Sequence, residues 1–340
     1  MNIYDVRAYY ETRGGPIKAV DGVSLDLAHG EILGIVGESG CGKSTLAAVL
    51  SGNAPPSLRI VSGLLRLDDH QEVDIARMRG TPRQWRGDVV SLLPQRALNS
   101  LNPTARIGDY AFDVMRAHHP HIRRAEAIAR ASERLEQLGL PARVLRNYPH
   151  ELSGGMRQRV VTVISTLLNP TVLIADEPTS ALDVSSQKAL VLMLQQMMRD
   201  GMISRIIFIT HDLALLSNIA TRIAVMYAGE IVEIGSTRQI IEHPDHPYAK
   251  ALISSTLEPD ESLRHRTIKG LQGSSPDMRR PPSGCRFHPR CDYAMEICAQ
   301  EAPPAVGEHR ARCWWVKQQL DLASGKGDNR DRGTHVAAAS

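Results

Sequence analysis

GESGCGKST, at residues 37–45, is the stretch that decides the fold of this chain. It fits the pattern GxxxxGK[ST], in which glycines let the backbone wrap an anion with its N–H groups pointing inward. The apolar run EILGIV at residues 31–36 precedes it and suits a buried strand, and STLAAVLSG at residues 44–52 is typical of a helix. A strand, a glycine-rich loop and a helix in this order predict a phosphate-binding loop.

The residues of this loop have distinct expected tasks. Lys43 should neutralise the β- and γ-phosphates of a nucleotide, and the hydroxyl of Ser44 should bind Mg²⁺. The helix that begins near Lys43 adds the positive end of its dipole. The residues expected to bind nucleotide here are Gly37, Glu38, Ser39, Gly40, Cys41, Gly42, Lys43, Ser44 and Thr45. The alternative, a purely structural turn, is disfavoured by the flanking strand and helix.

A second apolar run, at residues 172–175, ends in two acids, Asp176 and Glu177. Such a strand delivers its carboxylates to the C-terminal edge of a parallel sheet, where ligands bind in open α/β folds. Asp176 suits the Mg²⁺ shell, and Glu177 suits a base that accepts a proton from the attacking water. Two acids after a strand are usually a solvated turn. The phosphate-binding loop in the same chain favours the catalytic interpretation.

The surroundings of these motifs indicate an α/β core. Residues 1–30 are typical of β hairpins, and residues 206–210 (IIFIT) form another apolar run that suits a buried strand. Residues 123–139 show helical periodicity up to Gly139, a plausible C-cap, and lie in a helical insertion. Residues 223–234 predict a hairpin that turns at Ala228-Gly229. Strands separated by helices favour a parallel sheet.

The segment LSGGMRQR, at residues 152–159, predicts a second anion-binding helix start. Ser153 is a good N-cap, two glycines follow it, and a long helix comes next. The chain therefore carries two phosphate-binding helix starts, which need not serve the same nucleotide.

With these motifs in order, the chain resembles an ABC transporter ATP-binding subunit over roughly residues 1–255. The matching motifs are the phosphate loop, LLPQ at 92–95, LSGG at 152–155, VLIADE at 172–177, SALD at 180–183 and His211. The resemblance implies an ABC-type P-loop fold with a mixed sheet, an antiparallel β subdomain and a helical subdomain at about residues 96–165. It also implies a head-to-tail dimer, in which Ser153, Gly154 and Gly155 of one subunit close on the γ-phosphate held by the other subunit.

The same resemblance implies roles for further residues. Gln95 contacts Mg²⁺ and water, His211 contacts the γ-phosphate, and Asp183 links the two sites. Tyr10 matches the aromatic residue that stacks on adenine, although Tyr9 beside it is an equal candidate by sequence. The implied catalytic residues are Glu177, His211, Gln95 and Lys43, and the implied Mg²⁺ ligands are Ser44, Gln95 and Asp176.

Departures from the commonest ABC pattern point to a subfamily. Met156 stands where glutamine is usual, and HPYAKAL at residues 246–252 is similar to a segment of the dipeptide/oligopeptide and nickel importers, specifically of their D-type subunits. This resemblance implies ATP hydrolysis that energises peptide uptake, with nickel or oligosaccharide uptake and a non-transport ABC ATPase as alternatives.

The implied partners follow from the same subfamily. They are a paralogous ATPase subunit in a heterodimer, with a homodimer as the alternative, two transmembrane permease subunits and an extracytoplasmic solute-binding protein. The implied location is the cytoplasmic face of the inner membrane, where permease subunits hold the chain. No stretch approaches the ~18 uninterrupted apolar residues of a membrane span, and the N-terminus lacks the pattern of a secretory signal.

Composition argues against a nucleic-acid partner. The chain has 340 residues, with 40 Lys+Arg against 37 Asp+Glu and a net charge of +3. A nucleic-acid binder usually shows a stronger basic excess. Arg279-Arg280 and residues 123–130 are better explained as a solvated loop and a solvated helix face.

Four of the five cysteines, Cys285, Cys291, Cys298 and Cys313, are spaced C-x5-C-x6-C-x14-C. Four thiolates suit either Zn²⁺ or a [4Fe–4S] cluster, and metal-free thiols are the remaining alternative. The spacing resembles the C-terminal extension of the peptide-importer subfamily, which implies a [4Fe–4S] cluster of structural role. We therefore expect an ATPase domain at residues 1–255, an irregular metal-binding extension at 256–322 and a disordered tail at 323–340.

Overall fold

The structure is a computed structural model. It describes residues 1–67, 71–77, 85–95, 101–180, 182–256, 271 and 273–324. The start of the expected helical subdomain, at residues 96–100, and the expected disordered tail from residue 325 onward lie outside the described residues. Helix α10 (Trp314–Ala323) reaches the first residue of the expected tail.

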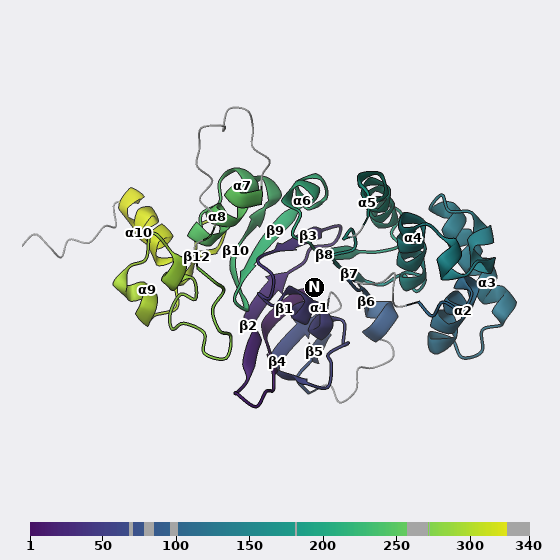
Figure 1. Cartoon of the computed structure of the whole chain (residues 1–340), viewed down its shortest axis with the longest axis horizontal. Helices are drawn as coiled ribbons and strands as arrows, with labels where there is room; N and C mark the ends of the chain where they lie inside the picture. The colour runs from purple at the N-terminus through teal and green to yellow at the C-terminus, as the bar shows by residue number, and fades with distance from the viewer. Residues whose placement is uncertain are drawn as a thin grey trace, which may run out of the picture.

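A six-stranded mixed sheet forms the centre of the molecule (Figure 1). Its strands, in spatial order, are β10 (Glu230–Ser236), β9 (Arg222–Tyr227), β3 (Ile32–Val36), β8 (Arg205–Ile209), β7 (Val172–Asp176) and β6 (Val90–Leu93). Neighbouring strands are parallel except β9 and β10, which form an antiparallel hairpin. Its turn lies at Ala228-Gly229, as the sequence predicts.

A second, antiparallel sheet covers one face of the first. Its strands, in spatial order, are β2 (Ile17–Asp26), β1 (Asn2–Tyr10), β4 (Leu58–Arg66) and β5 (Glu72–Asp74). A small two-stranded sheet in the C-terminal extension pairs β11 (Ala305–Val306) with β12 (Ala311–Arg312). The prediction of a mixed sheet with an antiparallel β subdomain is therefore confirmed.

The described α-helices lie on and beside the central sheet and in the C-terminal extension (Figure 1). They are α1 (Lys43–Leu50), α2 (Ile107–His118), α3 (Arg124–Gln137), α4 (Gly154–Ser165), α5 (Val184–Arg199), α6 (Leu213–Ile219), α7 (Thr237–Glu242), α8 (Pro247–Thr256), α9 (Glu296–Gln300) and α10. Gly139, with φ +69°, follows α3 as the expected C-terminal glycine.

Strand alternation divides the core between the two faces of the central sheet, because successive side chains point to opposite faces. In β3, Ile32 and Val36 join a cluster with the helices α2 to α8. Leu33 and Ile35 join another cluster with α1 and the antiparallel sheet. The helix after the phosphate loop and the helix after LSGG, α1 and α4, therefore pack on opposite faces.

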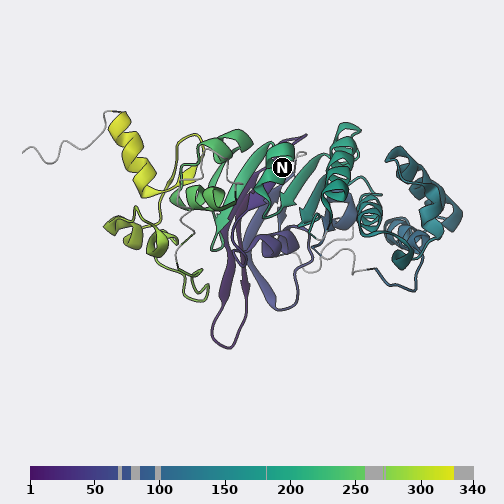
Figure 2. The ribbon, with the colours of Figure 1, turned by 45° about the horizontal axis from the view of Figure 1, so that its top comes forward.

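The C-terminal extension and the helices α2 and α3 lie at opposite ends of the molecule, with the central sheet between them, in both views of the ribbon (Figures 1 and 2). The extension is docked and not independent, since Phe287 is buried in the main core cluster. Among the described residues, no helix is long and apolar enough to cross a membrane.

Candidate nucleotide site

The phosphate loop lies between β3 and α1, where the sequence places it. Lys43 is the first residue of α1 and is buried. Its ammonium group donates hydrogen bonds to two carbonyl oxygens of the loop, Gly37 O at 2.7 Å and Glu38 O at 2.9 Å. The lysine therefore lies inside the curve of its own loop, where its charge faces the position of a bound anion.

Asp176 ends β7 beside this loop and has the character of a metal ligand. Its Oδ1 atom is buried and has no hydrogen-bond partner. Burial raises the pKa of Asp176, while a hydrogen bond with the Ser44 hydroxyl and the charge of Lys43 lower it, and the charge of Glu177 raises it. An unpaired buried carboxylate oxygen is costly. Mg²⁺ held by Asp176 and Ser44 removes this cost, so the residues present fit the ion that the sequence predicts.

Glu177 is the centre of a three-residue cluster. Gln95 Nε2 donates to its Oε2 at 2.9 Å, and His211 Nδ1 lies 3.3 Å from its Oε1. Glu177 has φ +46°, a conformation that non-glycine residues rarely adopt and that is enriched at functional sites. The structure thus brings together three predicted catalytic residues, of which Gln95 lies 82 positions before Glu177 and His211 lies 34 positions after it.

The two adjacent tyrosines that the sequence does not separate have different surroundings. The hydroxyl of Tyr10 lies 3.5 Å from Thr45 Oγ1 in the phosphate-loop helix. The hydroxyl of Tyr9 donates to Asp21 Oδ1 at 2.7 Å. Tyr10 therefore faces the phosphate loop, whereas the hydroxyl of Tyr9 is bonded within an ion-pair network of the β subdomain.

The LSGG segment begins α4 as expected. Ser153 is its N-cap and accepts the N–H of Met156 at 3.3 Å. Asp183 caps the neighbouring α5 by accepting the N–H of Ser186 at 2.9 Å. A Cβ atom at Gly155 would lie 2.3 Å from Ser186 Oγ, so the starts of the two helices are in contact. Together they form one polar edge on the face of the sheet opposite α1.

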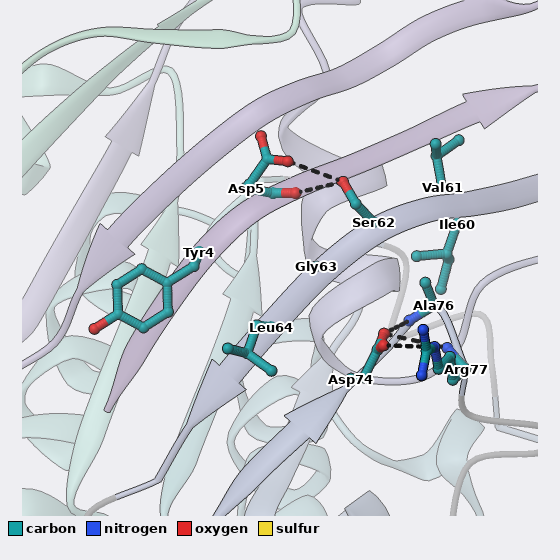
Figure 3. A pocket seen from close by; sticks show the side chains of 10 residues that line it. All are labelled: Tyr4, Asp5, Ile60, Val61, Ser62, Gly63, Leu64, Asp74, Ala76 and Arg77. Carbon is teal, nitrogen blue, oxygen red and sulfur yellow. Dashed lines mark hydrogen bonds and ion pairs between the residues drawn. The ribbon is translucent and has the colours of Figure 1, made fainter.

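A surface cavity lies elsewhere, on the antiparallel sheet (Figure 3). It has a volume of 540 Å³ and is lined by residues of β1, β4 and the end of β5. The Ser62 hydroxyl donates to the backbone oxygen and to Oδ2 of Asp5, and Arg77 pairs with Asp74. None of the predicted nucleotide-site residues lines it.

The four clustered cysteines are unpaired thiols in the extension. Burial, with a smaller effect of the neighbouring cysteines, raises the pKa of Cys285 to about 12 and that of Cys291 to about 11. The N–H of Cys285 donates to Cys298 O at 2.7 Å, which ties the first and third cysteines together. Four thiols in one segment have the chemistry of a donor set for a soft metal or cluster.

A compact group of three potential metal ligands occurs in one place among the described residues, at Glu233, Asp245 and His309. The two oxygens of Glu233 already accept the N–H groups of Asp245 and His246, each at 2.8 Å, and His309 Nδ1 lies 3.2 Å from Oε1. Burial raises the pKa of Glu233. Because these acceptors are occupied, we interpret the group as a junction between β10, the HPY segment and the extension.

The contacts of Glu38 with the C-terminal part of the chain are not predicted by any sequence pattern. Glu38 of the phosphate loop is bonded by Tyr248, Ser275 and Arg290, which lie 210 to 252 positions later in the chain. The HPY segment that contains Tyr248 was recognised, but nothing in its pattern indicated contact with the loop.

A phosphate-binding loop, a strand that ends in a magnesium-type aspartate and a catalytic-type glutamate define a P-loop nucleotide hydrolase. Comparison with known proteins shows which family within this class the chain resembles. The family model described as "ABC transporter" matches residues 20–180, and the family model described as "Oligopeptide/dipeptide transporter, C-terminal region" matches residues 232–298.

Relatives match over nearly the whole chain. The dipeptide transport ATP-binding protein DppD of Caldanaerobacter subterraneus subsp. tengcongensis is 42% identical over 92% of this chain and 96% of its own length. DppD of Bacillus subtilis is 36% identical over 97% and 99%, and the oligopeptide transport ATP-binding protein OppF of Escherichia coli is 38% identical over 91% and 93%. The chain therefore belongs to the ABC transporter ATP-binding subunits of the oligopeptide/dipeptide family, as its motifs predict.

A solved structure supports the fold. The dimeric ATP-binding cassette MJ0796, bound to ADP and phosphate, has a TM-score of 0.59 and 24% identity, and the match covers 70% of this chain and 98% of that one. The ABC cassette fold predicted for the N-terminal part is thereby confirmed. The chain is accordingly an ATPase subunit whose hydrolysis serves transport.

Proposed function

We propose that this chain is the ATP-hydrolysing motor subunit of an importer of dipeptides or oligopeptides. The observation that carries the proposal is the cluster of Glu177, Gln95 and His211 at the end of β7, in a chain that also has the oligopeptide/dipeptide C-terminal region. The named functions of the similar DppD and OppF proteins support the choice of cargo.

The site residues suit in-line attack of water on the γ-phosphate. Lys43 and the loop N–H groups hold the β- and γ-phosphates, and Glu177 accepts the proton of the attacking water. Gln95 and His211 orient the Glu177 carboxylate through their contacts with it. Ser44, Asp176 and Gln95 would hold Mg²⁺, which would supply charge neutralisation at the phosphate oxygens. Tyr10 stacks on the adenine, since its hydroxyl side faces the phosphate-loop helix.

The second anion-binding helix start serves the nucleotide of another subunit. Ser153 to Gly155 begin α4, which packs on the face of the sheet opposite α1. A head-to-tail dimer brings this helix start to the phosphates held by the partner, and Asp183 beside it links the two sites. We propose a paralogous ATPase subunit as that partner. Two permease subunits hold the pair at the cytoplasmic face of the membrane, and a solute-binding protein delivers the peptide.

A transport assay tests the proposed function. The chain is coexpressed with the companion ATPase, the permease subunits and the binding protein encoded with it, and the complex is placed in liposomes. We expect ATP hydrolysis that rises when the binding protein is loaded with a dipeptide or short peptide, and uptake of that peptide. Hydrolysis that responds to nickel chelates or oligosaccharides and not to peptides would contradict the proposed cargo.

We further propose that the four cysteines hold a [4Fe–4S] cluster that fastens the extension. The cysteine spacing C-x5-C-x6-C-x14-C resembles that of the C-terminal extension of the peptide-importer subfamily, and this resemblance supports a [4Fe–4S] cluster over a single zinc ion. When bound, the cluster supplies four metal–thiolate bonds to a segment with a small core of its own.

Replacement of one ligand tests this cluster. Cys285→Ser should lower iron and acid-labile sulfide from about four of each per chain to background, since each thiolate holds one iron. The thermal midpoint should fall as well. Cys41→Ser, which changes the cysteine of the phosphate loop, should leave the iron content unchanged. The anaerobically purified chains are assayed for iron, sulfide and zinc. One zinc ion per chain, or metal content that Cys285→Ser does not alter, contradicts the cluster.

A further inference from the structure

The carboxylate of Glu38, the second residue of the phosphate loop, is held by the C-terminal extension. Arg290 donates from Nη1 to Oε2 at 2.8 Å and from Nη2 to Oε1 at 2.9 Å, a two-pronged contact. The hydroxyl of Ser275 donates to Oε2 at 2.9 Å. The Glu38 N–H donates to the hydroxyl of Tyr248 at 2.8 Å. Bidentate Arg–carboxylate pairs are among the strongest and most directional contacts in proteins.

Arg290 is itself fixed in place. Its side chain is 7% exposed, and Nη1 lies 3.2 Å from the hydroxyl of Tyr227 in β9. It stands directly before Cys291, in a turn that the N–H of His288 closes by donating to Cys285 O at 3.0 Å. The guanidinium that binds the Glu38 carboxylate therefore belongs to the turn between Cys285 and Cys291.

The charge of Glu38 makes this contact functionally significant. Arg290 is the main cause of a lowered pKa of the Glu38 carboxyl, and the Lys43 ammonium lowers it further. Glu38 is therefore ionised at neutral pH, close to the lysine that neutralises phosphates. A carboxylate that is not paired at this position repels a triphosphate and competes for Lys43. The guanidinium of Arg290 both cancels its charge and directs it toward the extension.

We propose that Arg290 is a positioning residue of the nucleotide site: its pairing with Glu38 neutralises and orients the phosphate loop, and so makes ATP affinity depend on the docked cysteine extension. This inference rests on the proposed function, because ATP is the ligand whose binding is measured. It assigns the extension a task in nucleotide binding beyond its own stability.

If the Arg290–Glu38 pair acts through its charges, substitutions in it should change the KM for ATP in a pattern that a purely structural contact does not produce. Arg290→Gln leaves Glu38 as an uncompensated anion and should raise the KM for ATP about tenfold or more, while kcat changes less than about twofold. Glu38→Gln leaves Arg290 as an uncompensated cation and should lower KM. The double variant has neither charge, and its KM should return to within about threefold of the wild-type value.

The experiment uses the assembled transporter for KM and kcat and the purified chain for binding of a fluorescent ATP analogue. Arg310→Gln is the matched control, because Arg310 also joins the extension to the core, through Asp26 at 2.7 Å, but has no contact with the phosphate loop. Its KM should equal that of the wild type. Thermal midpoints and iron content are measured for every variant, so that a lost extension is recognised.

Two results would overturn the inference. One is an unchanged KM and analogue affinity in Arg290→Gln. The other is a double variant that binds ATP as poorly as Arg290→Gln alone, since rescue by Glu38→Gln is the signature of charge compensation. A wild-type complex that neither binds nor hydrolyses ATP counts instead against the proposed function, so the two failures are distinguishable.

Discussion

Replacement of Glu177 by Gln is expected to slow ATP hydrolysis by about 10²- to 10⁴-fold, the usual contribution of a general base. Glutamine keeps the shape of the side chain but cannot accept the proton of the attacking water. The contacts from Gln95 and His211 reach both oxygens of this carboxylate, so a near-isosteric change preserves their positions better than truncation does. ATP binding should persist, because Lys43 and the loop N–H groups are untouched.

The variant should also accumulate an ATP-bound dimer. In the proposed head-to-tail dimer, closure needs the nucleotide and the helix start at Ser153, whereas reopening needs hydrolysis. Phosphate release is measured on the assembled transporter, and association is measured by size exclusion with and without Mg-ATP. Glu242→Gln, an exposed side chain at the end of α7, is the matched control and should hydrolyse ATP at the wild-type rate. Normal phosphate release from the Glu177 variant would show that another group is the base.

The local parts of this site could be predicted from sequence because each consists of residues that are adjacent in the chain. The phosphate loop needs glycines and a lysine at fixed spacing, and one strand carries both Asp176 and Glu177 to the same sheet edge. The meeting of Gln95 and His211 at Glu177 is of another kind. It depends on which strands are neighbours in the sheet. The family resemblance implies that both residues act at the nucleotide, but it does not imply their contacts with Glu177.

The contacts that sequence did not predict depend on docking. The approach of Arg290 to Glu38 requires the extension to fold back over a separation of 252 positions, and no periodicity encodes that. The choice between Tyr9 and Tyr10 is similar. Alternation places the two on opposite sides of β1, but it does not say which side faces the phosphate loop. The positive φ of Glu177, +46°, likewise cannot be predicted from sequence, because a glutamate does not mark such a backbone position as a glycine does.

Substitution of Gly42 by Ala should lower the free energy of unfolding by about 3–5 kcal/mol and abolish ATP binding. Gly42 caps α1 with φ +110°, which side-chain-bearing residues rarely adopt. A Cβ atom there would lie 2.0 Å from the carbonyl oxygen of Ala19 in β2 and 2.8 Å from Met226 Cε. The obstacle is backbone of the neighbouring sheet and does not yield as a flexible side chain would.

Gly40→Ala separates the two contributions, since Gly40 also has positive φ, +81°, but a Cβ atom there meets nothing within 4 Å. Its expected cost is the backbone strain alone, about 1–2 kcal/mol. Urea unfolding is followed by tryptophan fluorescence, for which Trp85 is well placed, because its indole N–H donates to Leu50 O of α1 at 3.0 Å. Equal losses in the two variants would mean that backbone conformation, and not the close approach of β2, requires glycine in this loop.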